Sequence, residues 1–247
     1  MKIALITDLH ANREAVEAVM SHARGQGAVG WAFLGDFVGY GADPSWVVDM
    51  VREQVAQGAL AVQGNHDLAT VLGPNPAMRP DAHAVIEWTR AQLSQAQLDF
   101  LAALPMQQQH GDMLFVHANA YFPTGWDYVL HAGLALRSML ATRCRLTFCG
   151  HMHQPRLFHA GKVGRAGEFV PKLGAPIPLL ADRQWLVIPG SAGQPRDGNP
   201  AAAYAIYDRD AGTVTYHRID YDRETSAGKI RASGLPLRLA ARLLSGH

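Results

Sequence analysis

Apolar residues in the first 65 positions alternate between short continuous runs and stretches with helical spacing. The run at residues 3–7 is apolar at nearly every position, which is typical of a strand buried on both faces. In 12–24 apolar residues recur at helical spacing, and Asn12 is a candidate N-cap. Two more strands, at 31–34 and 60–63, flank a helix at 44–57. This βαβαβ order predicts a mainly parallel sheet covered by helices.

Further along the chain, strands become more frequent than helices. Residues 81–104 are expected to form two helices, 73–76 a loop, and the Gly- and Pro-rich segment 161–182 a surface loop or an irregular hairpin. Further strands are expected at 113–117, 146–149, 156–159, 185–188, 202–207 and 213–220, and further helices at 131–142 and 235–244. Because no repeat or linker-like tract interrupts this pattern, a single domain over 1–247 is expected.

Side chains that bind metal ions gather at the ends of five of these apolar runs. The five clusters are Asp8-Leu9-His10, Gly35-Asp36, Gly64-Asn65-His66-Asp67, the His117 of Phe115-Val116-His117, and Gly150-His151-Met152-His153. Because the carboxyl ends of parallel strands meet at one rim of a sheet, residues this distant in sequence can converge. Carboxylate, imidazole and amide ligands without cysteine suit divalent manganese, iron or zinc. The sequence therefore predicts one binuclear metal site, a common means of hydrolysing phosphate esters.

The clusters also suggest how the ligands divide between two ions. An aspartate can bridge two cations, and Asp36, in the middle cluster, is the candidate bridge. The remaining ligands would be Asp8, His10 and His153 for one ion, and Asn65, His117 and His151 for the other. Two divalent ions against two aspartates leave a positive surplus for a phosphate group, and a water shared by both ions would attack phosphorus.

Two residues beside the ligands are candidates for proton transfer. His66 would protonate or stabilise the leaving oxygen, and the alternative is a bond to loop backbone. Asp67 would orient the His66 ring or, with equal weight, cap a helix.

Three more residues are candidates for substrate contacts. Asn12 would contact substrate or cap the helix after it, Tyr40 would stack on a base or pack a loop, and Arg196 would grip a phosphate or remain solvated. Trp126 and Tyr128, which follow the strand of His117, would wall the site or pack at its rim.

This ordered set of five motifs resembles the calcineurin-like metallophosphoesterase superfamily over residues 1 to about 220. More locally, Asn12, the run Gly35-Asp36-Phe37-Val38-Gly39-Tyr40-Gly41, and Pro189-Gly190-Ser191 followed by Gln194-Pro195-Arg196 resemble a branch of small bacterial and archaeal phosphodiesterases near the symmetrical diadenosine tetraphosphatases. The resemblance implies an α/β fold, a four-layer αββα sandwich of two mixed β-sheets flanked by helices, with a dinuclear metal site at the strand ends. It also places the family's metal and acid roles on the positions assigned above.

The chain departs from the family pattern at two places. Ala118 follows the isolated His117, where many members have glycine, and no arginine follows Asp67 closely, as one does in protein phosphatases. The second departure argues against a protein phosphatase.

The composition limits the classes of molecule that the protein is expected to bind. A formal net charge of +1 provides no basic track for a nucleic acid, so a small phosphorylated substrate is expected instead. No apolar stretch is long enough to span a membrane, and Cys144 and Cys149 show no disulfide pattern, so a cytoplasmic protein is expected. The expected cofactors are two divalent ions, manganese first, with iron, zinc or nickel as alternatives. The oligomeric state has no signal in the sequence.

The expected activity is metal-dependent hydrolysis of a small phosphodiester or phosphoanhydride. A diadenosine-polyphosphate hydrolase and a phosphomonoesterase or protein phosphatase are the alternatives within the same chemistry. A non-catalytic scaffold with the same fold is a more distant alternative, because such a protein would lack His66 or a metal ligand, and this chain has the full set.

Overall fold

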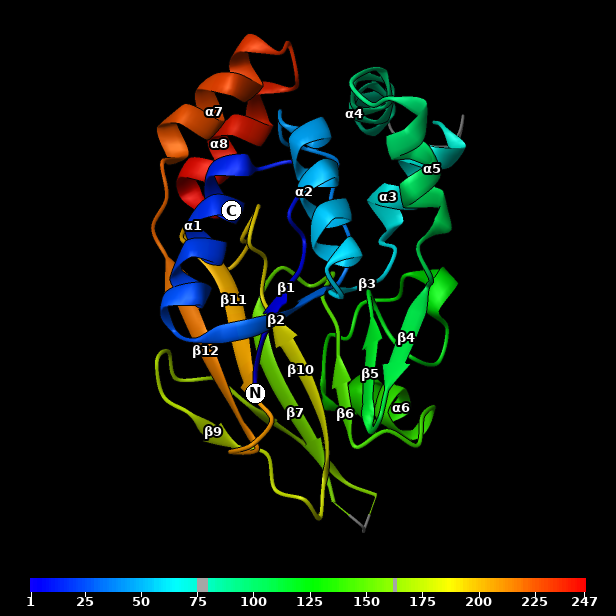
Figure 1. Cartoon of the computed structure of the whole chain (residues 1–247), viewed down its shortest axis with the longest axis vertical. Coiled ribbons are helices and arrows are strands. Elements are labelled where there is room, and N and C mark those ends of the chain that lie inside the picture. Colours follow the sequence, from blue (N-terminus) through cyan, green and yellow to red (C-terminus); the bar gives the residue numbers. More distant parts are fainter. Residues whose placement is uncertain (75–79, 162–163) are drawn as a thin grey trace.

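The computed structural model describes residues 1–74, 80–161 and 164–247. Two six-stranded sheets pack face to face, and helices cover their outer faces (Figure 1). The first sheet has the strand order β3 (Leu60–Ala61), β2 (Ala28–Phe33), β1 (Lys2–Ile6), β11 (Ala202–Asp208), β12 (Thr213–Ile219) and β9 (Ile177–Pro178). The second has the order β4 (Gln107–His110), β5 (Met113–Val116), β6 (Leu146–Phe148), β10 (Gln184–Pro189), β7 (Pro155–Ala160) and β8 (Ala166–Phe169).

Helices lie on both outer faces and at one end of the sandwich. They are α1 (Arg13–Gly25), α2 (Pro44–Ala56), α3 (Asn65–Leu72), α4 (Pro80–Ala91), α5 (Gln95–Ala103), the short 3₁₀ turn Pro123–Gly125, α6 (Ala132–Leu140), α7 (Arg223–Ala232) and α8 (Leu237–Ser245). In Figure 1, α7 and α8 lie at one end of the molecule beside α1, and α6 lies against the second sheet. The predicted α/β sandwich of two mixed sheets flanked by helices is confirmed.

The continuous apolar run of β1 follows from its position between two cores. Ile3 and Leu5 point into the core between the sheets, whereas Ala4 and Ile6 point into the core beneath α1 and α2. Successive strand residues point to opposite faces. Since both faces of β1 are buried from Ile3 to Ile6, all four of these positions are apolar and the usual alternation disappears.

Parallel pairing is confined to the part of each sheet that leads to the predicted ligands. β1, β2 and β3 are mutually parallel, as are β5, β6 and β10. The expectation of a mainly parallel sheet is wrong, because β11, β12 and β9 complete the first sheet in antiparallel order. The five motifs nevertheless follow the carboxyl ends of β1, β2, β3, β5 and β6, so they all emerge on one edge.

Several elements were not expected from the sequence. Helix α7 was missed because it is largely polar with a central Gly228, and α3 was expected only as an alternative, because it begins at Asn65, inside a ligand motif. The segment predicted as a loop or irregular hairpin at 161–182 carries the short strands β8 and β9. The two helices predicted within 81–104 are confirmed as α4 and α5. The loop predicted at 73–76 lies partly outside the described residues.

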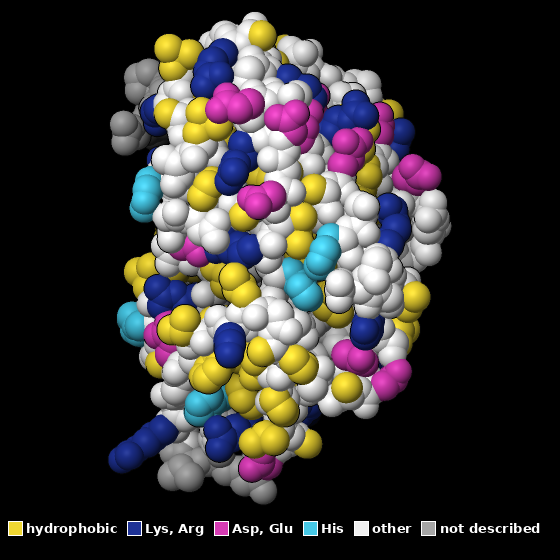
Figure 2. Space-filling model, turned by 90° about the vertical axis from the view of Figure 1, so that its left-hand side faces the viewer, with side chains coloured by type: hydrophobic (Ala, Val, Ile, Leu, Met, Phe, Trp, Pro, Cys, Tyr) yellow, Lys and Arg dark blue, Asp and Glu magenta, His cyan; other side chains and the backbone are white. Residues whose placement is uncertain are grey.

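The surface does not separate its charges into large tracts on the face drawn in Figure 2. Lys and Arg side chains lie among Asp and Glu over the upper part of this face, and hydrophobic side chains gather in its lower half. A nucleic-acid track would instead require a continuous line of positive charge. Within the described part of the chain, every helix is too short or too polar to cross a bilayer.

Candidate metal centre

The predicted ligands lie on tight loops whose backbone is held in an uncommon conformation. Eight described residues other than glycine have positive φ, and five of them are predicted ligands: Asp8, His10, Asp36, His151 and His153. Left-handed backbone is unfavourable for residues with a side chain, and it persists where surrounding structure over-determines it. Backbone bonds between loops provide that support, since the His10 amide donates to the Asp36 carbonyl (2.9 Å) and the Asp8 amide to that of Gly35 (3.0 Å).

The glycines in the ligand motifs allow these loops to touch. A Cβ on Gly64 would lie 2.2 Å from both the amide nitrogen and Oδ1 of Asp36, and a Cβ on Gly150 would lie 1.8 Å from Thr7 Oγ1. No larger residue fits without moving a ligand loop. The two motifs therefore need glycine because of close packing around Asp36 and Asp8.

One group of buried donor atoms combines the first, second and fifth motifs. Ligand atoms of Asp8, His10, Asp36 and His153 all lie within 4.8 Å of one another. The Nε2 atoms of His10 and His153 are 3.2 Å apart, and His153 Nε2 lies 3.2 Å from Asp8 Oδ1. Asp8 Oδ2 accepts from Thr7 Oγ1 and the His151 amide, whereas buried Oδ1 has no hydrogen-bond partner. That free oxygen faces the group.

A second group shares Asp36 with the first. Ligand atoms of Asp36, His117 and His151 lie within 4.8 Å of one another, and Asn65 Oδ1 is 3.2 Å from His117 Nε2. Asp36 Oδ1 accepts from the His66 amide (2.8 Å). Its Oδ2 lies 3.3 Å from His117 Nε2 and 3.7 Å from His10 Nε2. One oxygen of Asp36 therefore lies between the two groups.

Each of the four histidines is oriented by a backbone carbonyl. Nδ1 lies within hydrogen-bond distance of a carbonyl oxygen in three of them, and in His151 it is Nε2 that does so. The pairs are His10 with Val38 (3.0 Å), His117 with Leu34 (2.7 Å), His153 with Gln194 (2.6 Å) and His151 with Trp126 (2.9 Å). A carbonyl can only accept, so each of these ring nitrogens carries the proton, and the other nitrogen of a neutral ring presents a lone pair to the group.

The charge states around Asp36 follow from burial and mutual contact. Burial raises the pKa of Asp36, but the surrounding histidines, His117 first, outweigh burial and hold it well below its usual range. Burial lowers the pKa of His117, but the Asp36 and Asp8 carboxylates raise it to about 9. Burial, with a contribution from Asp36, raises the pKa of Asp8 to about 7 despite opposition from His117. Asp36 is thus the ionised centre of the site.

The other ligand histidines are neutral. Burial lowers the pKa of His10 and His153 well below the usual range, and burial together with nearby His117 lowers that of His151 to about 3. Neutral imidazoles are the form that binds metal ions. In the first group, the lone pairs of the neutral His10 and His153 rings therefore face each other and Asp8 Oδ1 at close range.

The structure brings His66, Tyr40 and Arg196 together beside the first group. The ring of His66 lies edge-on to Tyr40 (centroids 4.4 Å apart) and to His10 (5.0 Å). The Arg196 guanidinium lies 5.4 Å from the centre of the Tyr40 ring, and its Nε and Nη2 both donate to Gln194 Oε1. These three side chains form one wall of the site.

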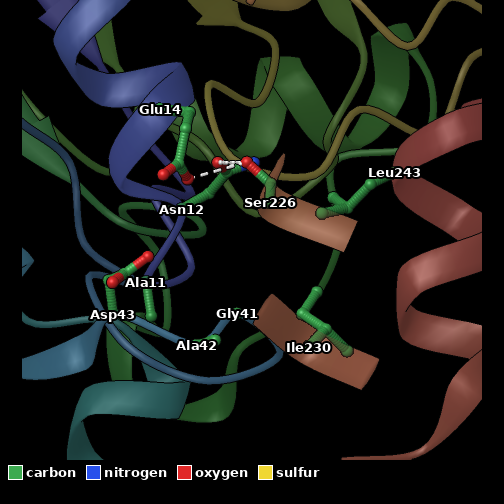
Figure 3. A pocket seen from close by; sticks show the side chains of 9 residues that line it. All are labelled: Ala11, Asn12, Glu14, Gly41, Ala42, Asp43, Ser226, Ile230 and Leu243. Carbon is green, nitrogen blue, oxygen red and sulfur yellow. Dashed lines mark hydrogen bonds between the residues drawn. The ribbon is translucent and has the colours of Figure 1, made fainter. Parts of the chain in front are cut away.

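Asp67 and Asn12 have structural roles rather than the site roles predicted for them. Asp67 does not orient His66, because both its oxygens accept backbone hydrogen bonds: Oδ1 from Phe37 and Val38, Oδ2 from Asp36 and Gly64. Asn12 caps α1, because its Oδ1 accepts from the Ala15 amide, and the same oxygen accepts from Ser226 Oγ (Figure 3). Its Nδ2 donates to the carbonyl of Gly193 and to the hydroxyl of Tyr221. The helix-capping alternative is confirmed for Asn12, whereas the cap of α3 is Gly64 and Asp67 is the third residue of that helix.

The sequence analysis did not identify the residues that orient the ligand Asp8 through hydrogen bonds. Thr7 donates to Asp8, and Ser191 Oγ donates to the Asp8 carbonyl (2.9 Å). Two features of the sequence could have identified them: Thr7 directly precedes Asp8, and Ser191 lies in the motif Pro189-Gly190-Ser191. Tyr128, considered for the wall of the site, stacks on His151 with centroids 4.1 Å apart and is 42% exposed. It therefore borders the second group.

The fold and the donor set together are those of a metallophosphoesterase. A calcineurin-like phosphoesterase superfamily domain matches residues 1–212, so the chain belongs to that superfamily. An uncharacterized protein of Methanocaldococcus jannaschii is 33% identical over 259 residues, covering 99% of this chain and 98% of that protein.

Solved structures extend the likeness to the whole chain. A metallophosphoesterase from Sphaerobacter thermophilus is similar with 35% identity and a TM-score of 0.88, each chain covered completely. A hypothetical protein from Pyrococcus horikoshii has a TM-score of 0.78 at 16% identity, with 100% of this chain and 98% of that chain covered, and shows the shared fold alone.

The role of Asp67 as an anchor of the ligand loops can be tested by Asp67→Asn. The amide nitrogen of asparagine cannot accept, so at least one buried backbone N–H would lose its partner at a cost of about 1–3 kcal/mol. We expect urea unfolding of chelator-treated protein to show that loss. Asp49→Asn, which alters an exposed carboxylate paired with Arg52, is the control and should change stability by less than about 1 kcal/mol. Equal effects of the two substitutions would contradict the anchoring role.

Proposed function

We propose that the chain hydrolyses a small phosphodiester or phosphoanhydride with divalent metal ions held by the two groups that share Asp36. The observation that carries the proposal is the opposition of ligand lone pairs. His10 and His153 present unprotonated Nε2 atoms to each other at 3.2 Å, beside an unpartnered Asp8 Oδ1. Lone pairs at this distance repel one another, and a buried carboxylate oxygen without a partner is costly. A cation among them removes both penalties.

The donor set fits a pair of divalent ions. Asp8, His10 and His153 would hold one ion, Asn65, His117 and His151 would hold the other, and Asp36 would serve both. Mixed carboxylate, imidazole and amide donors accept manganese, and also iron, zinc or nickel. When bound, such ions would activate water as a nucleophile and neutralise charge developing on the phosphoryl oxygens.

The protein's own residues would complete the chemistry. Burial lowers the pKa of His66, with Arg196 and His117 acting in the same direction against Asp36, so the ring is neutral near pH 7. A neutral imidazole still donates one N–H, and it can stabilise negative charge on a departing oxygen. Arg196 and Tyr40, on the same wall, would position the substrate.

The proposal is tested by stripping the protein of metal, reloading it with manganese and comparing three substrates. Bis-p-nitrophenyl phosphate, p-nitrophenyl phosphate and diadenosine tetraphosphate represent a diester, a monoester and a dinucleoside polyphosphate. We expect activity that depends on manganese, with the diester or the dinucleotide preferred. A preference for the monoester would favour a phosphomonoesterase instead. Metal-loaded protein that cleaves none of the three would overturn the proposal and favour the scaffold alternative.

Asp36→Asn tests the shared oxygen. Asparagine lacks the charge that compensates two cations, so we expect the variant to retain at most one ion per chain. Metal content after gel filtration, measured by atomic emission, gives the result directly. Asp112→Asn, which alters an exposed carboxylate beside Arg145, should keep the wild-type content. Two ions per chain in Asp36→Asn would refute a bridging role.

His66→Ala tests assistance to the leaving group. We expect both metals to remain, while kcat falls by about 10²–10⁴-fold for an alkyl leaving group and far less for p-nitrophenolate, which needs little stabilisation. His110→Ala, at an exposed position on β4, is the control. Equal losses on both kinds of substrate would remove His66 from this role.

A further inference from the structure

The segment between the ligand His117 and α6 carries several exposed aromatic and apolar side chains. In residues 121–130, four of the ten positions are Tyr, Phe or Trp, against 8% aromatic residues in the whole chain. Phe122, Tyr128 and Leu130 are 54%, 42% and 55% exposed. Exposed apolar side chains that gather in one place, rather than singly, indicate an interaction surface. Residues 119–130 are called the aromatic loop below.

The shape of the aromatic loop is maintained by polar contacts that leave its exposed rings free. Buried Asn119 links two parts of the loop, because its Oδ1 accepts from the Phe122 amide (2.8 Å) and its Nδ2 donates to the Asp127 carbonyl (3.0 Å). The Ala120 amide donates to Ser138 Oγ on α6 (2.9 Å). A surface held in this way is ordered before a ligand arrives, which lowers the entropic cost of binding.

The aromatic loop contacts both histidines of the second group. The Trp126 carbonyl accepts from His151 Nε2 (2.9 Å), and the Trp126 ring lies 5.8 Å from that of His117. The Tyr128 ring stacks on His151, with centroids 4.1 Å apart and 12° between the planes. The imidazole covers one face of the Tyr128 ring, so the exposed part of this ring consists of its other face and its edges. Tyr128 therefore offers a flat surface one ring away from a predicted metal ligand.

The chemistry of the aromatic loop suits an uncharged planar group rather than another phosphate. Positions 119–130 contain no Lys or Arg, and Asp127 is exposed. The guanidinium of Arg137 lies against the loop, but it stacks on the Tyr121 ring, 4.0 Å from its centre. A flat ring with a free face binds other flat rings by stacking.

The position of the aromatic loop indicates which part of a substrate it meets. His66, proposed to assist the leaving oxygen, lies edge-on to His10 of the first group, whereas Tyr128 lies on His151 of the second. In a phosphoryl transfer the leaving oxygen departs roughly in line with the attacking one. With the leaving group on the side of His66, the substituent that stays on phosphorus is the one that can reach Tyr128.

Resting on the proposed function, we infer that the aromatic loop is a subsite for a nucleobase on the part of the substrate that remains attached to phosphorus. The base stacks on the free face of Tyr128, and its sugar spans the distance to the phosphate at the metal centre. The substrate is then a nucleotide ester or anhydride whose hydrolysis leaves a nucleoside phosphate on the side of the second group.

The test uses two diesters with the same leaving group. They are the p-nitrophenyl esters of thymidine 5′-monophosphate and of 1-O-methyl-2-deoxyribose 5-phosphate, which lacks the base. In each, water attacks phosphorus, p-nitrophenolate leaves, and the sugar stays on the phosphate. We expect manganese-loaded wild type to prefer the thymidine ester in kcat/KM by roughly tenfold or more, as stacking of one base contributes. High salt should not abolish this preference, because the base is uncharged.

Tyr128→Ala should lose most of the preference, and Tyr128→Phe should keep it, because stacking needs the ring and not the hydroxyl. Phe169→Ala is the matched control, since Phe169 is 45% exposed on β8, outside the aromatic loop. It should leave the preference unchanged.

Calorimetric titration with the two reaction products gives a readout that is independent of turnover. Thymidine 5′-monophosphate should bind manganese-loaded wild type more tightly than 1-O-methyl-2-deoxyribose 5-phosphate, and Tyr128→Ala should bind the two equally. Equal binding of both products by wild type would contradict the subsite.

The outcomes separate the subsite from the proposed function. Hydrolysis of neither ester by metal-loaded wild type would overturn the proposed function. Hydrolysis of both with equal kcat/KM, or with a preference that Tyr128→Ala retains, would overturn the subsite alone. Equal losses on the two esters in Tyr128→Ala would mean that Tyr128 only supports the His151 ring, which also overturns the subsite.

Discussion

The rest of the site depends on the carbonyl oxygens that hold the four ligand histidines. Each ring has one N–H committed to a carbonyl on a neighbouring loop, so the ring cannot turn away from the nitrogens and oxygens that oppose its lone pair. Repulsion between the facing Nε2 lone pairs of His10 and His153 would otherwise open the site. The protein thus keeps donor atoms together in an arrangement that a bound cation would relieve.

That constraint explains why the loops are so tightly connected. Positive φ at the ligand positions is unfavourable for each residue alone, and backbone bonds from one loop to the next maintain it. The Asp67 carboxylate accepts hydrogen bonds from four backbone amides of two loops. Asn12 links the loop after β1 to Gly193 and to α7. Residues of a site can therefore be required for its geometry without touching what it binds.

The same connections link the metal centre to the chain's last helices. The superfamily match ends at residue 212, yet α7 and α8 are held to three loops of the site through Ser226, Lys229 and Gly246. Metal-dependent phosphoester hydrolysis needs little more than the shared centre, and the surroundings of that centre decide which ester reaches it. In this protein those surroundings include Tyr40 and Arg196 beside the first group and Tyr128 beside the second.

The sequence by itself determined the set of candidate ligands, and the resemblance of their motifs to a known superfamily implied the fold class. Strands buried on both faces are continuous apolar runs, and polar residues directly after such runs must lie at a sheet edge, so Asp8, Asp36 and His117 could be recognised locally. Only the tertiary structure decided which nitrogen of each histidine faces the metal groups. That choice depends on carbonyls such as those of Val38 and Trp126, whose positions no local sequence pattern encodes. The tertiary structure also decided that Asp67 and Asn12 bind backbone groups of distant loops. Periodicity reports burial of a segment's own face, whereas these contacts depend on how distant loops meet.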